Sequence, residues 1–211
     1  MGIPPITPYA MPHESELPGN QVPWRPDPSR AVLLIHDMQR HFVNHFGAGE
    51  PVTELVENIR RIRQTANQLG VPVVYTAQTG SMSREDRGLL HGFWGPGMSS
   101  DAASTGIVDR LAPGPLDIVL AKWRYSAFQR SDLETIIRAG GRDQLIVCGV
   151  YAHVGCLMTA SEAFALDIQP FLVADALADL SLDDHLMALR YAADRCAVPV
   201  SLADVLAALE S

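Results

Sequence analysis

Two charged side chains, Asp37 and Lys122, each follow a short apolar run of this sequence. Asp37 comes just after the run 31–35, and Lys122 comes directly after 118–121. A carboxylate beside a buried strand is partly desolvated, which predicts a raised pKa and a side chain suited to donating a proton. A lysine beside it would supply a fixed cation. The alternatives are a helix-capping Asp37 and a Lys122 that is an ordinary surface charge.

Further polar groups follow other apolar runs. Gln78 comes after the run 71–76, and the glycine-flanked turn 149–155 comes after 144–148. Such a turn into a helix would point backbone N–H groups at a developing negative oxygen. An arginine in the loop after Gln78 could pair bidentately with a carboxylate. These side chains could line the walls of a site, or could simply be loop packing and a solvated charge: Phe42, Arg87, Trp94 and Tyr125.

Strands and helices are expected to alternate along the chain. The apolar runs that predict strands are 31–35, 71–76, 118–121, 144–148, 171–174 and 198–201. Helices are expected at 53–69, from a capping box at Ser131–Glu134 to Gly140, near 154–166, from Asp183 or Asp184 to about Cys196, and at 202–209. This alternation predicts an α/β fold whose mainly parallel sheet is covered on both faces. Ligands of such sheets bind beyond the carboxyl ends of the strands, where all the polar groups above would meet. The irregular stretch 78–104 is expected to be a lid or a binding loop.

Composition excludes several classes of protein. The chain has 211 residues, a formal net charge of −8 and no cluster of Lys and Arg, which argues against nucleic-acid binding. No apolar run is long enough to span a membrane. Three cysteines without CxxC spacing, and no recognisable signal peptide, predict reduced thiols in the cytoplasm.

The first 29 residues differ from the rest. Their many prolines forbid a regular helix or a central strand. We expect residues 1–29 to form an extended arm and residues 30–211 to form a single domain. Ile3, Ile6, Tyr9 and Trp24 favour an arm that docks on the domain, and the alternative is a mobile tail.

Six blocks of sequence resemble the isochorismatase family and occur in this order: LLIHDMQ, YTAQ, FWGPGM, KWRYSAF, GVYAHVGC and DIQPFLVADALAD. The resemblance as a whole extends from about residue 3 to residue 205. The resemblance implies a six-stranded parallel sheet in a three-layer α/β/α fold, a homodimer, and no metal or cofactor. It implies that Asp37 is the catalytic acid and that Lys122 is its catalytic partner. The positions implied to contact substrate are Gln78, Arg87, Tyr151 and Gly155. It also implies a cis peptide before Tyr151.

The implied reaction is hydrolysis of the enol-pyruvyl vinyl ether of isochorismate or 2-amino-2-deoxyisochorismate. The products would be pyruvate and a trans-dihydrodiol acid or its amino analogue, for phenazine-type or siderophore-type biosynthesis. The residues after YTAQ and the block FWGPGM resemble the phenazine-type members of the family, so we favour the amino substrate. The block ADALAD is more similar to the siderophore-type members. No carrier domain is expected after residue 211. Protonation of the vinyl methylene needs an acid but no nucleophile, and Asp37 could supply it.

Two alternatives remain open. Related amidases use an Asp–Lys–Cys triad, and Cys156 lies close to the position of their nucleophile. Aligning the turn places Gly155 at that position, so Cys156 would be rotated by about 100° along a helix and would face packing. An Asp-x-His metal element, which nicotinamidases have after the second strand, is also missing from 76–82. The other alternative is an inactive relative that serves as a binding protein.

Overall fold

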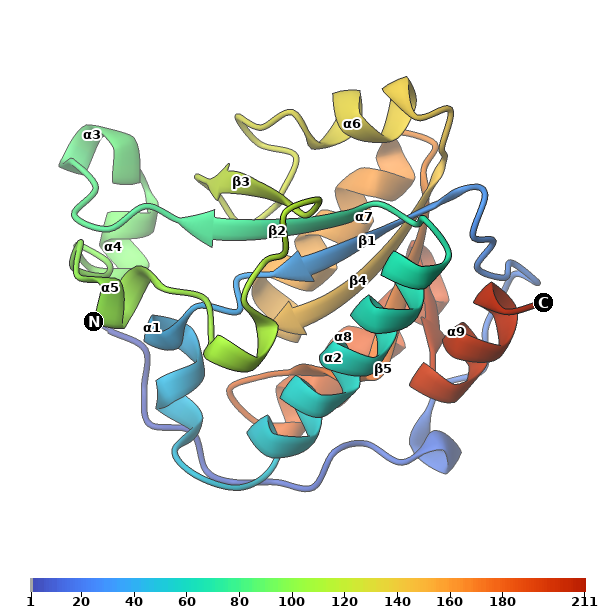
Figure 1. The fold of residues 1–211 in the computed structure, drawn as a ribbon. Helices are drawn as coiled ribbons and strands as arrows, with labels where there is room; N and C mark the ends of the chain where they lie inside the picture. The colour runs from blue at the N-terminus through green and yellow to red at the C-terminus, as the bar shows by residue number, and fades with distance from the viewer. Residues whose placement is uncertain (1) are drawn as a thin grey trace.

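Six apolar segments form the sheet at the centre of the molecule (Figure 1). The computed structural model describes residues 2–211. The strands are β1 (Ala31–His36), β2 (Val73–Gln78), β3 (Ile118–Lys122), β4 (Gln144–Val150), β5 (Gln169–Ala178) and β6 (Val198–Val200). All neighbouring pairs are parallel, in the order β3-β2-β1-β4-β5-β6. The predicted fold class is therefore confirmed.

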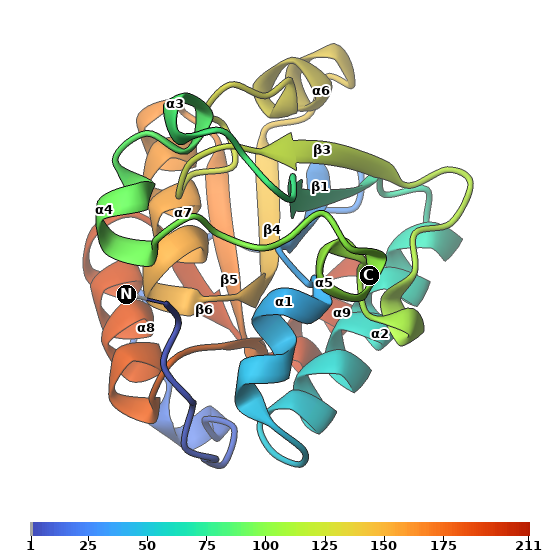
Figure 2. The ribbon, with the colours of Figure 1, turned by 90° about the vertical axis from the view of Figure 1, so that its left-hand side faces the viewer.

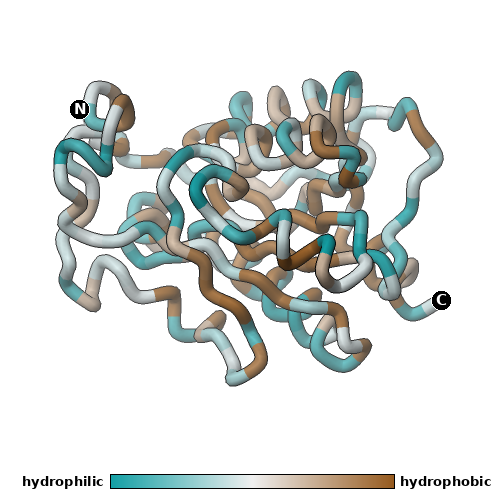
Figure 3. The backbone as a smooth tube through the Cα atoms, turned by 90° about the horizontal axis from the view of Figure 1, so that it is seen from above, coloured by the Kyte–Doolittle hydropathy of each residue, from teal (hydrophilic) through white to brown (hydrophobic). Residues whose placement is uncertain are grey.

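Alternate residues of β1, β2, β4 and β5 enter two separate apolar cores. Leu33 and Ile35 pack on the side of α2 (Val52–Gln68) and α9 (Leu202–Leu209). Leu34 packs on the other side, with a group of three helices. Those helices are α6 (Leu133–Ala139), α7 (Leu157–Ala165) and α8 (Leu182–Arg195). Figure 2 shows α7 and α8 on one side of the sheet and α2 on the other, and Figure 3 shows apolar segments gathered in the central strands. Burial of both faces explains why these four strands are almost continuously apolar, whereas the edge strand β3 exposes part of its apolar run.

The strand order places a topological switch point between β1 and β4. The chain moves from β1 through β2 to β3 on one side, and from β4 through β5 to β6 on the other. Loops at the carboxyl ends of β1 and β4 therefore diverge and leave a crevice, where ligands of open α/β sheets bind. Asp37 follows β1 directly, so the fold brings it to this crevice.

Two predicted helix caps are wrong. α8 begins after Ser181, whose hydroxyl accepts the N–H of Asp184, so neither Asp183 nor Asp184 is the cap. Serine and aspartate are both common N-caps, so the sequence alone does not show whether Ser181 or one of the two aspartates caps the helix. The capping box at Ser131–Glu134 does not form, because the helix begins after Asp132 and the Ser131 hydroxyl accepts the N–H of Leu133 rather than that of Glu134.

The stretch 78–104 is also more regular than predicted. It contains α3 (Arg84–Arg87), α4 (Leu90–Trp94) and most of α5 (Ala102–Thr105). Each helix spans only four or five residues, too short for an apolar period to show in the sequence. Three other short helices are α1 (Arg40–Val43) and the 3₁₀ turns η2 (Asn44–Phe46) and η3 (Asp109–Leu111). α1, η2, α3 and α4 stand around the crevice.

Residues 2–30 run along the surface in extended form, with one 3₁₀ turn, η1 (Glu14–Glu16). Ile6 and Met11 are buried in the core on the α2 side. The side chain of Asn20 donates to the carbonyl of Pro199 on β6 at 3.0 Å. The division into an arm and a domain stays a prediction. Among residues 2–211, no helix is long and apolar enough to cross a bilayer.

Candidate active site

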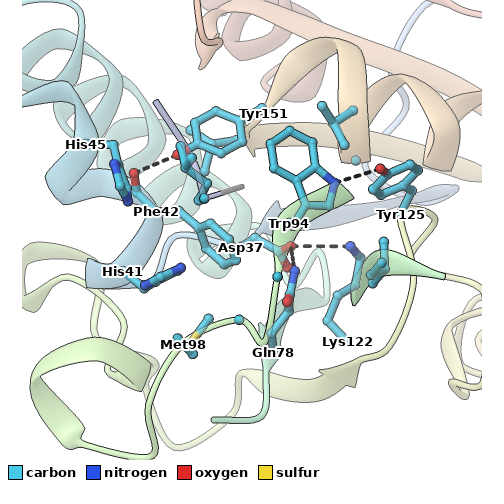
Figure 4. A pocket seen from close by; sticks show the side chains of 18 of the residues that line it. Asp37, His41, Phe42, His45, Gln78, Trp94, Met98, Lys122, Tyr125 and Tyr151 are labelled. Atoms are coloured by element: carbon cyan, nitrogen blue, oxygen red, sulfur yellow. Dashed lines mark hydrogen bonds and ion pairs between the residues drawn. The ribbon is translucent and has the colours of Figure 1, made fainter. Parts of the chain in front are cut away.

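A cavity of about 460 Å³ opens at the crevice beyond β1 and β4. Its size is typical of a pocket for a small organic molecule. Figure 4 shows its lining side chains converging from the strand ends and from the loops around them. All nine residues singled out from the sequence line it: Asp37, Phe42, Gln78, Arg87, Trp94, Lys122, Tyr125, Tyr151 and Gly155.

Asp37 is held by three neighbouring side chains. Its backbone is left-handed, with φ of 50°, which an aspartate tolerates better than most residues. The Thr76 hydroxyl donates to Oδ1 at 2.5 Å. Lys122 Nζ lies 3.3 Å from Oδ2, and the Gln78 amide lies 3.4 Å from the same oxygen. The carboxylate is 5% exposed, so it is not a solvated helix cap.

The predicted raised pKa of Asp37 is wrong. Burial alone would raise the pKa of this carboxyl, but the Lys122 ammonium and the Thr76 hydroxyl outweigh it and hold the pKa below its ordinary value. Burial could be predicted from the strand pattern, whereas the positions of Lys122 and Thr76 beside Asp37 could not. Asp37 is therefore a carboxylate paired with Lys122.

Lys122 reaches Asp37 because of the sheet register. It is the last residue of β3 and lies opposite Gln78, the last residue of β2. Its side chain is 3% exposed, so it is not an ordinary surface charge. Lys122 and Asp37 therefore form a buried ion pair, and a negative charge added to the cavity would compete with Asp37 for the lysine.

Arg87 is a buried cation without an anionic partner. It is 6% exposed, and its Nη1 donates to Gln78 Oε1 at 3.1 Å while its Nε donates to the carbonyl of Gly95. No carboxylate within residues 2–211 forms an ion pair with it. A buried guanidinium bound only to neutral acceptors is suited to an anionic ligand.

The turn after β4 does not offer the predicted row of free N–H groups. Residues 152–156 form a single π-helical turn, in which Val154, Gly155 and Cys156 all donate to the carbonyl of Tyr151. His153 N–H is taken up by Asp179. These N–H groups are satisfied within the protein, so they are not available to an oxyanion. The Val150–Tyr151 peptide is cis, as the resemblance implied.

Cys156 does not share the cavity with Asp37. It is fully buried and belongs to the core on the α6–α8 side of the sheet, whereas Gly155 lines the cavity. Burial raises the pKa of the Cys156 thiol well above its ordinary value, so it is not a thiolate at neutral pH. A nucleophilic role for Cys156 is not favoured.

Aromatic residues form the remaining walls. Trp94 Nε1 donates to the Tyr125 hydroxyl at 2.7 Å, which joins α4 to the loop after β3. Tyr151 donates to the carbonyl of Phe42, and their rings meet edge to face. These contacts hold two pairs of aromatic rings beside the cavity, and Figure 4 shows both pairs close to Asp37.

Several lining residues were not predicted. His36 lies next to Asp37 and accounts for the glycine at 155, since a Cβ there would overlap its ring and lie 2.8 Å from Nε2. Thr76 binds Asp37 without lining the cavity, and it stands two residues before Gln78, a spacing that could have revealed it. Met98 lines the cavity at the end of the block FWGPGM. Other lining residues come from segments with no motif: Gly2, Ile3, His41, His45 and Leu90.

Comparison with known proteins assigns the chain to a family. The isochorismatase domain matches residues 31–204. The chain belongs to the isochorismatase family. It is 56% identical to the isochorismatase of Bacillus subtilis, over 100% of this chain and 68% of that protein. It is 55% identical to phenazine biosynthesis protein PhzD of Pseudomonas fluorescens, over 97% of this chain and 98% of that protein.

The fold is shared more widely within this family and beyond it. A cysteine hydrolase from Pseudomonas syringae pv. phaseolicola superposes with a TM-score of 0.80 at 24% identity, over 90% of this chain and 96% of that one. Similarity at that level concerns the fold alone. The site itself differs from that of a cysteine hydrolase, because in this isochorismatase-family chain a glycine lines the cavity and the thiol of Cys156 is buried in the core.

Proposed function

We propose that this chain hydrolyses the enol-pyruvyl vinyl ether of isochorismate or 2-amino-2-deoxyisochorismate, releasing pyruvate and the dihydrodiol acid or its amino analogue. The single observation that carries the proposal is a buried carboxylate, Asp37, at the head of a cavity with cationic side chains and no thiol. Membership of the isochorismatase family supports the same reaction. Such an enzyme would serve phenazine-type or siderophore-type biosynthesis.

The reaction proposed begins with proton transfer to carbon. Asp37 donates its proton to the terminal methylene of the vinyl ether, which becomes a methyl group, and an oxocarbenium ion forms at the neighbouring carbon. Water adds to that carbon and gives up a proton to the Asp37 carboxylate. The resulting hemiketal collapses to pyruvate and the ring alcohol, so the carboxyl is regenerated and no bond to the enzyme is formed.

Substrate binding supplies the missing proton on Asp37. The free carboxylate is paired with Lys122, but a substrate carboxylate placed near both groups would compete for the ammonium. A second negative charge nearby raises the pKa of Asp37, which then takes up a proton from solvent. Desolvation by the bound substrate acts in the same direction.

Gln78, Arg87 and Lys122 are proposed to hold the enol-pyruvyl carboxylate. Their side chains form a continuous series, because Arg87 donates to Gln78, and Gln78 and Lys122 both reach Asp37. A carboxylate bound along this series would lie beside Asp37. The methylene is attached to the carbon that carries this carboxylate, so binding would also bring the methylene to the acid. Phe42, Trp94, Tyr125, Tyr151 and Gly155 would contact the rest of the substrate.

The proposal is tested by coupling pyruvate release to lactate dehydrogenase. We expect pyruvate from isochorismate or from its amino analogue, and we expect Cys156→Ala to retain it. Ammonia released from an amide substrate, and lost in Cys156→Ala, would establish the amidase instead. No turnover of either class, with tight binding of the ring product, would establish a binding protein. The ratio of kcat/KM on the two vinyl ethers measures which one the cavity prefers.

We also propose that the protein is a cytoplasmic homodimer. Exposed apolar side chains on α7 and α8, including Phe164 and Tyr191, support an association surface. Light scattering on the purified chain measures the assembly, and a mass of one chain at micromolar concentration would refute the dimer.

A further inference from the structure

Two histidines form a second basic corner of the cavity. His41 on α1 and His45 on η2 are four residues apart, and their ring centroids are 5.8 Å apart, edge to face. Both line the cavity, although neither belongs to the series around Asp37. Figure 4 shows them on the opposite side of the cavity from Lys122, with Asp37 between.

The charges that face this corner are mainly positive. Among the described residues, Asp37 is the only carboxylate that lines the cavity. Arg87 on α3 and Lys122 on β3 also line the cavity, together with the phenols of Tyr125 and Tyr151. His36 at the end of β1 is a third lining imidazole, and burial lowers its pKa to about 4. Burial also lowers the pKa of His41 and of His45, and for His41 the charges of His45 and Arg87 add to the effect. These imidazoles can therefore gain a proton when an anion lies beside them.

The substrate proposed above has a second carboxylate that the Asp37 end cannot hold. Arg87, Gln78 and Lys122 surround the enol-pyruvyl carboxylate, which must lie beside the carbon that Asp37 protonates. The ring extends away from that carbon and bears its own carboxylate. The wall made by α1 and η2 is on the far side of the cavity, so the ring carboxylate would be directed toward His41 and His45.

We propose that His41 and His45 bind the ring carboxylate and make the cavity selective for a substrate with two carboxylates. The inference rests on the proposed function, since that function supplies the two carboxylates. Each imidazole N–H can donate to an oxygen, and a gained proton strengthens the hydrogen bond by making it charge-assisted. Arg87 and Lys122 outnumber Asp37, the lining carboxylate, so the cavity is locally positive in a chain of net charge −8, and protonation of the two imidazoles beside a dianion would add to that potential.

Kinetics of His41→Asn, His45→Asn and the double variant test this role. We expect each single change to raise KM about ten-fold, the effect of losing one hydrogen bond to a charged group, while kcat falls much less. Asparagine keeps a polar side chain of similar length, and His41→Gln and His45→Gln repeat the test if either variant misfolds. His91→Asn on α4, which does not line the cavity, is the matched control.

The pH dependence separates binding from a structural role. Anion binding favours protonated imidazoles, so the ratio of variant KM to wild-type KM should be largest near pH 5.5 and smaller at pH 8. The response of Asp37 is common to both proteins and cancels in the ratio. A KM that stays at the wild-type value in the double variant, or a ratio that does not change with pH, would overturn the proposal.

Benzoate, a ring carboxylate without the enol-pyruvyl group, keeps this test independent of turnover. Calorimetric titration should show benzoate bound more tightly at pH 6 than at pH 8, and the double variant should lose about ten-fold or more of that affinity. If the wild-type protein released no pyruvate, the proposed function would fail while this titration still decided the role of the histidines. Equal benzoate affinity in wild type and double variant would overturn it.

Discussion

Asp37 is surrounded by residues that are distant in sequence, and this explains which of its properties could be predicted. Its place at a strand end, near Gln78 and Lys122, could be predicted from the alternation of strands and helices. Its lowered pKa depends on Lys122 at 3.3 Å and on Thr76, whose positions follow only from the register of β1, β2 and β3. Residue types at strand ends predict which side chains belong to a site, but they do not predict whether a side chain such as Asp37 is protonated.

Proton uptake on substrate binding is the first consequence. Since the lowered pKa keeps Asp37 ionised and the group must be protonated to act, substrate binding should take up about one proton per site for Asp37. The double variant of His41→Asn and His45→Asn isolates this proton from any that the two imidazoles gain. The overall hydrolysis neither consumes nor releases a proton, so the uptake should reverse after pyruvate forms. A single-turnover experiment in weak buffer with a pH indicator measures both phases. Absence of any uptake before pyruvate appears would mean that Asp37 is already protonated in the free protein.

Gly155 is predicted to be irreplaceable while His36 is present. A Cβ at residue 155 would overlap the His36 ring, which is fixed by a 2.8 Å hydrogen bond to the carbonyl of Val150. We expect Gly155→Ala to lower the free energy of unfolding by about 1–3 kcal/mol, the usual cost of overpacking. The double variant with His36→Ala should lose less than the sum of the two single changes. Urea denaturation of the four proteins measures this, and strict additivity would contradict the contact.

Secondary-structure elements were predicted where their apolar patterns are long. The six strands and the longer helices α2, α7, α8 and α9 lie close to their predicted ranges, because burial on both sides of the sheet imposes the pattern. The short helices α3, α4 and α5, and the π-helical turn after β4, were not predicted. They are set by contacts with other segments, such as that of Arg87 with Gly95, rather than by their own period.

The hydrogen bond between the π-helical turn η4 (Ala152–Cys156) and Asp179, the residue after β5, should make stability depend on pH. His153 Nδ1 lies 2.7 Å from Oδ1 of buried Asp179, and this hydrogen bond raises the pKa of His153. The pKa of His153 is higher in the folded protein than in the unfolded chain. The pair therefore stabilises the fold fully at pH values below the pKa of the unfolded chain, and this stabilisation is lost as pH rises through the pKa of the folded protein. His153→Asn should therefore lower the free energy of unfolding by roughly 1 kcal/mol at pH 5.5 and by less at pH 9. Urea denaturation at the two pH values measures this. An equal loss at both pH values would show that the imidazolium contributes nothing.

At the scale of the whole molecule, the N-terminal segment lies against the cavity. The sequence did not predict this position. Gly2 and Ile3 line the cavity, and the N–H of Ile6 donates to the carbonyl of His45 at 3.1 Å. Farther along, the Tyr9 hydroxyl accepts the N–H of Asp179. Apolar residues between prolines predicted docking, but the face on which they dock depends on the completed sheet and helices.

Removal of residues 2–8 should therefore affect binding and stability together. The truncation opens one wall of the cavity, so we expect KM to rise about ten-fold. It also exposes the apolar surface that Ile6 covers, so we expect the free energy of unfolding to fall by about 2 kcal/mol. Ile6→Ala, which keeps the chain and the backbone hydrogen bond, should cause a smaller loss of both. Unchanged kinetics and melting temperature in the truncated protein would favour a mobile tail.

Asp37→Asn is the most direct test of the central claim, which is that a single carboxyl group protonates the vinyl ether without an enzyme nucleophile. Asparagine keeps the size of the side chain and removes its transferable proton. We predict that kcat for pyruvate release falls by about 10²–10⁴-fold, the usual contribution of a general acid, while Cys156→Ala stays close to wild type. Pyruvate release by Asp37→Asn at the wild-type rate would contradict the account.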